Sequence, residues 1–192
     1  MLLAPSSGCD ASTPDQPTAI RIDRVLGEPG RSPGQFIFPR GIDAGAEGLW
    51  IVDKTGRVQL IDTEWGEPRQ VVQMPAIERG LPTGLTVAPA PGDPTREAVW
   101  IPDTHQQRVY IIDPASPDAP LAEFGGFGRG PGEFIYLTDV AVLTDNAGRV
   151  ERIYVSEYGG NDRVSIFDAS FRFLNSFGSF GVADDERSGE IV

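Results

Sequence analysis

Residues 153–168, IYVSEYGGNDRVSIFD, decide the fold, because two weaker copies of this stretch lie upstream. The first copy is LWIVDKTGRVQLID at residues 49–62, and the second is VWIPDTHQQRVYIID at residues 99–113. In each copy, apolar residues alternate along two runs on either side of a polar loop, which is the pattern of two strands joined by a hairpin. The sequence therefore predicts a repeated β unit.

The repeat has the length of a four-stranded blade. The arginine of the motif RVxxxD recurs at Arg57, Arg108 and Arg163, which are 51 and 55 residues apart. This spacing is typical of blades rather than of helical pairs. A shorter strand precedes each copy and an outer strand follows it. We therefore expect three blades, at residues 38–75, 81–125 and 137–178, with inner strands that begin at Phe38, Leu81 and Leu137 and outer strands over residues 69–74, 121–124 and 173–177.

An aromatic residue occupies the same place in the first strand of every copy, at Trp50, Trp100 and Tyr154. Side chains alternate between the two faces of a strand, so this residue lies on the face opposite to its apolar neighbours. We interpret the three aromatic residues as packing between neighbouring blades, and an aromatic ligand cage is the alternative.

Two glycine-rich crossovers connect an outer strand to the next inner strand: GRSPGQFIFP from Gly30 and GRGPGEFIYL from Gly128. Together with the hairpin D…RVxxxD, they resemble the NHL repeat family of six-bladed, TolB-like β-propellers. Residues 76–81, which lead into the blade between them, lack this glycine-rich crossover motif. The resemblance implies an all-β fold, a β-propeller of four-stranded antiparallel blades, of which about three of six are present in residues 19–192.

Residues 19–26, AIRIDRVL, alternate and are expected to form a strand that completes the last blade of a ring. Closed propellers need four to eight blades, so three blades leave apolar faces open. We expect either a fragment of a longer chain or two copies that close one ring by self-association.

We expect residues 1–18 to be a signal remnant or a flexible linker. Cys9 is the only cysteine, and Ser7-Gly8-Cys9 resembles the end of a bacterial lipoprotein signal, although the basic region of such a signal is missing. We expect an extracytoplasmic protein that is lipid-anchored through Cys9. The alternatives are a chance cysteine and, if Met1 is the true start, a cytoplasmic protein.

The formal net charge of −12, from 16 basic and 28 acidic side chains, disfavours a nucleic-acid partner. An acidic surface repels the phosphate backbone. We expect a protein, peptide or glycan ligand instead.

The connectivity of a propeller places the crossovers and the hairpin loops on one face, and loops carry function when the scaffold repeats. The alternative is that these loops are solvent-exposed turns whose sequences differ without any function. Our candidate binding-face residues are Arg40, Lys54, Thr83, His105, Asp139, Glu157, Tyr158 and Asn161.

Opposite charges flank each hairpin loop: Asp53 with Arg57, Asp103 with Arg108, and Glu157 with Arg163. Because the arrangement recurs in every blade, we interpret it as a structural clamp rather than a catalytic pair. As exposed ion pairs, they would each contribute about 0 to 1 kcal/mol.

The main functional hypothesis is a binding scaffold without catalytic residues or cofactor. A zinc site of the propeller lyase type is not expected, because His105 is the only histidine. The runner-up is a calcium-dependent lactonase or lyase-like enzyme, with Asp139 and Glu157 as metal ligands beside Asn161 and Asp162. A third hypothesis is a fragment without function of its own.

Overall fold

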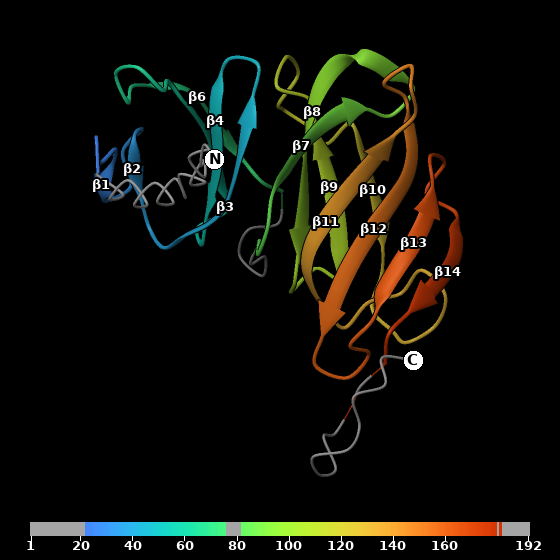
Figure 1. Ribbon diagram of the computed structural model, residues 1–192. Helices are drawn as coiled ribbons and strands as arrows, with labels where there is room; N and C mark the ends of the chain where they lie inside the picture. The colour runs from blue at the N-terminus through green and yellow to red at the C-terminus, as the bar shows by residue number, and fades with distance from the viewer. Residues whose placement is uncertain (1–21, 76–81, 180, 182–192) are drawn as a thin grey trace, which may run out of the picture.

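The computed structural model describes residues 22–75, 82–179 and 181 (Figure 1). These residues form fourteen strands and their connecting turns, and no helix lies among them. Twelve of the strands make three separate four-stranded sheets, in which every strand is antiparallel to its neighbours. The fold is therefore all-β and made of propeller-type blades, as the repeat predicts.

Each blade follows the order of the chain from its inner to its outer strand. Blade 1 consists of β3 (Pro39–Gly45), β4 (Gly48–Asp53), β5 (Arg57–Ile61) and β6 (Pro68–Gln73). Blade 2 consists of β7 (Thr86–Ala90), β8 (Asp93–Asp103), β9 (Arg108–Ile112) and β10 (Ala122–Gly125). Blade 3 consists of β11 (Tyr136–Thr144), β12 (Val150–Tyr158), β13 (Val164–Asp168) and β14 (Phe173–Phe177).

The inner strand of blade 2 is shorter than the sequence predicts. Regular pairing begins at Thr86, whereas Pro82 makes a single bridge to Asp103. Thr83 still donates a backbone hydrogen bond of 3.2 Å to the Pro102 carbonyl, so the chain stays beside β8 before β7 begins. Leu81, the predicted start of this strand, lies outside the described residues.

The aspartate that ends each RVxxxD motif begins the turn to the outer strand. Its Oδ1 atom accepts a hydrogen bond from the backbone N–H two residues later, at 2.8 Å for Asp62 and 2.9 Å for Asp113 and Asp168. Such turns reverse the direction of the chain, because the aspartate side chain accepts the hydrogen bond that a backbone carbonyl would accept in an ordinary turn. The constant spacing within the motif therefore sets where the third strand of each blade ends.

Large apolar side chains fill the spaces between blades. Trp50 of blade 1 lies in one core with Val99 and Ile101 of blade 2. Trp100 of blade 2 lies in a second core with Ile153 and Val155 of blade 3. Both tryptophans are buried, which confirms packing between blades for Trp50 and Trp100, whereas Tyr154 is partly exposed.

Neighbouring inner strands are joined by polar contacts as well. Asp43 Oδ2 accepts a hydrogen bond of 2.8 Å from the Val87 N–H, and Thr86 Oγ1 donates one of 2.5 Å to the Val140 carbonyl. These bonds link β3 to β7 and β7 to β11, and so fix the order of the blades.

The chain before blade 1 forms a small parallel pair, β1 (Glu28–Pro29) with β2 (Gln35–Phe36), at the left of Figure 1. The predicted closing strand over residues 19–26 is described only from Ile22 onward. This part is in no strand, and Ile22 and Val25 are exposed. Its role in closing a ring stays a prediction.

Replacing Trp100 tests the packing between blades. Trp100→Ala should lower the free energy of unfolding by about 3–5 kcal/mol, because it empties a buried core site. Tyr154→Ala is the matched control at the equivalent but partly exposed position, where about 1 kcal/mol or less is expected. Urea unfolding followed by circular dichroism measures both, and equal losses would contradict the assignment.

Candidate binding face

The crossovers and the hairpin loops meet on one face of the blades. In blade 1 the Lys54 N–H donates to the Ile37 carbonyl at 3.0 Å, and in blade 3 Arg129 Nη1 donates to the Gly160 carbonyl at 3.1 Å. Each bond joins a crossover to the hairpin loop of the blade that follows it. We call this surface the loop face.

A buried arginine binds the first crossover to blade 1. Arg57 Nη2 donates to Asp53 Oδ2 at 2.5 Å and to the carbonyls of Gly30 and Gln35 at 3.0 Å each. Its Nη1 donates to the Arg31 carbonyl at 2.6 Å. Both charged side chains are buried. We call this arrangement the arginine latch, because one guanidinium joins a strand end to the backbone of a loop.

The same latch recurs in blade 3. Arg163 Nε donates to Glu157 Oε1 at 2.8 Å, and Nη2 donates to the carbonyls of Glu133 and Gly130 at 2.9 and 3.1 Å. The second carboxylate oxygen of Glu157 accepts hydrogen bonds of 2.8 Å from the Ile135 N–H and from Asn161 Nδ2. Both carboxylate oxygens of Glu157 therefore have structural partners within the protein.

Blade 2 departs from this pattern. Arg108 Nη1 pairs with Glu123 on the outer strand at 2.6 Å, and both side chains are partly exposed. The Oδ1 atom of Asp103 accepts from the backbone N–H groups of His105 and Gln106. The expected clamp thus forms in two blades, where the carboxylates are fully buried and the side chains of Arg57 and Arg163 are only 10 % and 15 % exposed. In both of these blades the arginine donates to carbonyls of a glycine-rich crossover, a motif that residues 76–81 before blade 2 do not carry.

The glycines of the crossover are required by its shape. Gly30 and Gly128 have φ values of +155° and +154°. A Cβ on either would lie 2.0 Å from the side-chain oxygen of Gln35 or Glu133. That oxygen accepts a hydrogen bond from a backbone N–H three residues earlier, which closes the crossover on itself. A larger residue would break this closure.

Hydrogen bonds lower the pKa of the Asp53 carboxyl below its ordinary value. Burial opposes ionisation, but hydrogen bonds from Thr55, the Ile37 N–H and Arg57 outweigh that effect. The latch in blade 1 is thus held by an ionised carboxylate.

The predicted face residues fall into two groups. Thr83 and Thr104 both donate to the Leu137 carbonyl, at 3.0 and 2.7 Å, so Thr83 holds two blades together. With Glu157 and Asn161, Thr83 belongs to the scaffold. The members that are exposed on the surface, and so able to contact a ligand, are Arg40, Lys54, His105, Asp139 and Tyr158.

Two exposed aromatic residues of the loop face are absent from our candidates. Phe38 lies under the Lys54 ammonium, 5.5 Å from ring centre to nitrogen. Tyr136 stacks on Tyr158 with 5.4 Å between ring centres. Phe38 and Tyr136 occupy equivalent places, the ninth residue of each glycine-rich crossover motif. The recurrence of an aromatic residue there was the signal that could have identified them.

The proposed calcium ligands do not form a cluster. Among the described residues, no group of three or more histidine, cysteine, aspartate or glutamate side chains could hold a metal ion. Asp139 lies opposite Ser156 on the inner strand, while the Glu157 carboxylate is turned toward Arg163. Cys9, the candidate lipidation site, lies outside the described residues. Within the described ranges, no helix could cross a membrane.

Removing the latch arginine should destabilise the protein strongly. Arg57→Ala leaves the Asp53 carboxylate buried without its cation, and we expect a loss of about 3–5 kcal/mol in the free energy of unfolding. Arg108→Ala, at the equivalent position of blade 2, removes an exposed pair and should cost about 0–1 kcal/mol. Urea denaturation of both variants measures the difference, which would vanish if the latch were only a surface ion pair.

The lowered pKa of Asp53 predicts a loss of stability in acid. A carboxyl whose pKa is lower in the folded state stabilises the protein above its unfolded pKa, near 3.8, and this contribution is lost as the pH falls through the folded value. Asp53→Asn removes this proton uptake, so its free energy of unfolding should fall less steeply below about pH 4 than that of the wild type, by at most about 1.4 kcal/mol per pH unit. Urea titrations at several pH values measure both proteins. A free energy of unfolding that depends on pH in the same way in the wild type and in Asp53→Asn would argue against an ionised Asp53.

No family model matches the chain. Among solved structures, the chain is similar to the β-propeller domain of Cps50 (Swd1) from Myceliophteria thermophila, with 14 % identity, a TM-score of 0.49 and coverage of 72 % of this chain and 42 % of that one. It is also similar to the WD40 domain of Pan2 from Neurospora crassa, with 12 % identity, a TM-score of 0.44 and coverage of 76 % and 41 %. A protein of unknown function from Bacteroides thetaiotaomicron gives 18 % identity, a TM-score of 0.46 and coverage of 77 % and 35 %. The chain thus spans less than half the length of each of these structures.

Proposed function

We propose that this protein is a binding scaffold of the β-propeller type whose loop face takes a protein or peptide ligand. The observation that carries the proposal is the recurrence of exposed aromatic residues on that face, at Phe38 in blade 1 and at Tyr136 and Tyr158 in blade 3. The fold alone does not specify a function, so the proposal depends on these side chains.

Exposed aromatic side chains are the groups that most often anchor a protein partner, because they bury a large area with little loss of conformational entropy. Phe38 and Tyr136 lie near the ends of the crossovers to which Arg57 and Arg163 donate hydrogen bonds. A rigid platform loses less freedom when a ligand binds. The arginine latches thus hold the backbone at the aromatic residues in a fixed conformation before a ligand binds.

The exposed cations of the loop face can pair with carboxylates of a ligand. Arg40, Lys54 and Arg129 are exposed there together with the acidic residues Glu133 and Asp139, and the chain as a whole carries a formal net charge of −12. Cations beside aromatic rings favour a segment that offers apolar side chains next to carboxylates. We therefore propose a peptide segment of this chemistry as the ligand.

Selection of random displayed peptides on the wild-type protein tests the proposal. Binders should be enriched in apolar and acidic residues and should lose about 30-fold or more in affinity on Tyr158→Ala, because a buried aromatic anchor contributes about 2 kcal/mol or more. Trp65→Ala is the matched control, since Trp65 is also exposed but lies in the turn between β5 and β6, away from the hairpin loops.

Peptides that bind the Tyr158→Ala, Tyr136→Ala and Phe38→Ala variants as tightly as the wild type would contradict a site on the loop face. A glycan array probed with the same variants separates the ligand classes. Glycan binding that Tyr158→Ala abolishes would indicate a sugar ligand instead of a peptide.

A further inference from the structure

The hairpin loop of blade 3 carries two consecutive glycines that contact an aromatic ring and a guanidinium. Gly159 and Gly160 have φ values of +75° and +135°, a conformation that favours glycine. A Cβ on Gly159 would lie 2.5 Å from the Tyr136 ring, and a Cβ on Gly160 would lie 3.1 Å from Arg129 Nη2. Neighbouring Cα atoms are about 3.8 Å apart, so a peptide segment of about three residues can contact the ring and the guanidinium together.

The aromatic ring belongs to the exposed pair of Tyr136 and Tyr158. The two residues lie opposite each other on β11 and β12, and they are 40 % and 51 % exposed. Because the rings are already stacked on each other, they lose little further freedom when a side chain packs on them. The pair therefore suits an apolar side chain of a ligand.

Arg129 is held through both its main chain and its side chain. Its carbonyl accepts a hydrogen bond of 3.2 Å from Nη1 of the latch residue Arg163, and its own Nη1 donates one of 3.1 Å to the Gly160 carbonyl. The residue is exposed, and none of the seven ion pairs among the described residues includes it. The guanidinium is thus oriented on the surface without a carboxylate partner from the described part of the chain.

The carboxylates nearest to Arg129 along the crossover and the hairpin loop have backbone partners instead. Asp162 Oδ2 accepts a hydrogen bond of 3.1 Å from the Gly160 N–H, and Glu133 Oε2 accepts one of 2.9 Å from the Gly130 N–H. A guanidinium offers parallel N–H groups that match the two oxygens of a carboxylate. Arg129 therefore suits a carboxylate that a ligand supplies.

We propose that Arg129 selects a carboxylate in the ligand of the loop face, next to an apolar side chain that contacts Tyr158. The inference rests on the peptide-binding function proposed above, and it assigns the preference for acidic ligands to blade 3. The carboxylate is an aspartate or glutamate side chain or the C-terminus of the peptide, because the guanidinium meets the same two oxygens in each.

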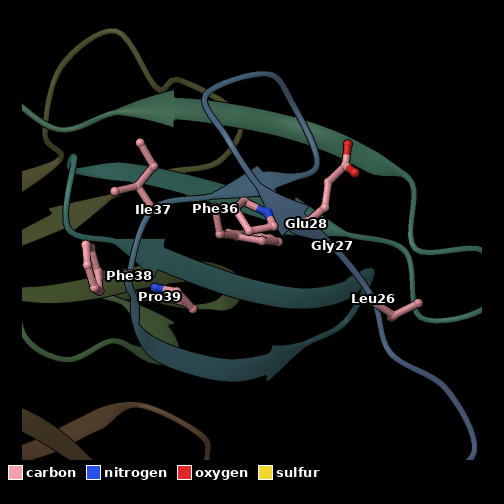
Figure 2. A pocket seen from close by; sticks show the side chains of 8 residues that line it. Leu26, Gly27, Glu28, Phe36, Ile37, Phe38 and Pro39 are labelled. Carbon is pink, nitrogen blue, oxygen red and sulfur yellow. The ribbon is translucent and has the colours of Figure 1, made fainter.

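Blade 1 repeats the crossover without this subsite. Arg31 lies 98 residues before Arg129, and its carbonyl likewise accepts a hydrogen bond from a latch arginine, Arg57. Arg31 is exposed, and its side chain has no hydrogen bond or ion pair among the described residues. Figure 2 shows Phe38, the counterpart of Tyr136, in the lining of an apolar groove of about 540 Å³. An arginine that no carbonyl orients loses more freedom when it binds a ligand.

Binding of matched peptides tests the inference. The probe is a selected peptide whose affinity falls about 30-fold or more on Tyr158→Ala, which establishes the site first. Its acidic residues are then replaced one at a time, aspartate by asparagine and glutamate by glutamine, and a further form has an amidated C-terminus. One of these forms should bind the wild type about tenfold less tightly, because a charge-assisted hydrogen bond is lost. Isothermal titration calorimetry measures each affinity.

Arg129→Gln should remove this preference. The variant should bind the acidic peptide and that amide form within about twofold of each other, since glutamine donates a hydrogen bond but carries no charge. Arg31→Gln is the matched control, because it removes the same charge at the equivalent place of blade 1, and it should keep the full preference. Both arginines are exposed, so both variants should keep the circular dichroism spectrum of the wild type. The form that loses affinity shows whether the carboxylate is a side chain or the C-terminus.

A wild type that binds every amide form as tightly as the acidic peptide would overturn the inference. So would a preference that survives in Arg129→Gln or that disappears equally in Arg31→Gln. In each of these cases the loss of affinity on Tyr158→Ala would still support the binding scaffold. If no selected peptide depends on Tyr158, the proposed function fails and the inference fails with it.

Discussion

The structure depends on a buried guanidinium that binds a carboxylate and a set of backbone carbonyls at once. A buried arginine needs acceptors for its donors, and a tight loop needs donors for its inward carbonyls. In blades 1 and 3, Arg57 and Arg163 meet both needs together, between the end of one strand and the crossover that leads into the blade. The crossover and the hairpin loop thereby stabilise each other, although neither of them belongs to a four-stranded sheet.

This arrangement links the repeat to the loop face. Glycine lets each crossover fold tightly enough for its carbonyls to reach the guanidinium, and the aromatic residue that follows is left on the surface. Blade 2 has no glycine-rich crossover, and its arginine pairs with Glu123 on β10 instead. The two blades with latches are also those that present the exposed aromatic residues Phe38 and Tyr136.

The sequence was sufficient to predict the blades and the packing of Trp50 and Trp100, because alternation and spacing report which side of a strand is apolar. It was not sufficient to show that the pair of Asp53 and Arg57 is buried. Spacing along the chain cannot reveal that residues 30–35 lie over this pair. For the same reason Glu157 and Asn161 were assigned to the binding face, whereas they support the crossover, and Phe38 and Tyr136 were missed because they belong to the crossover pattern rather than to a hairpin loop.

Hydrogen exchange of the Arg163→Ala variant tests the central role of the latch most directly. The amides of Gly128, Glu133, Phe134 and Ile135 all donate hydrogen bonds within or next to the second crossover. The account predicts that these amides exchange faster in the variant, while those of Ile153 and Val155 in the central strand β12 keep their protection, because local opening follows the loss of local contacts. Unchanged protection in the crossover would contradict it.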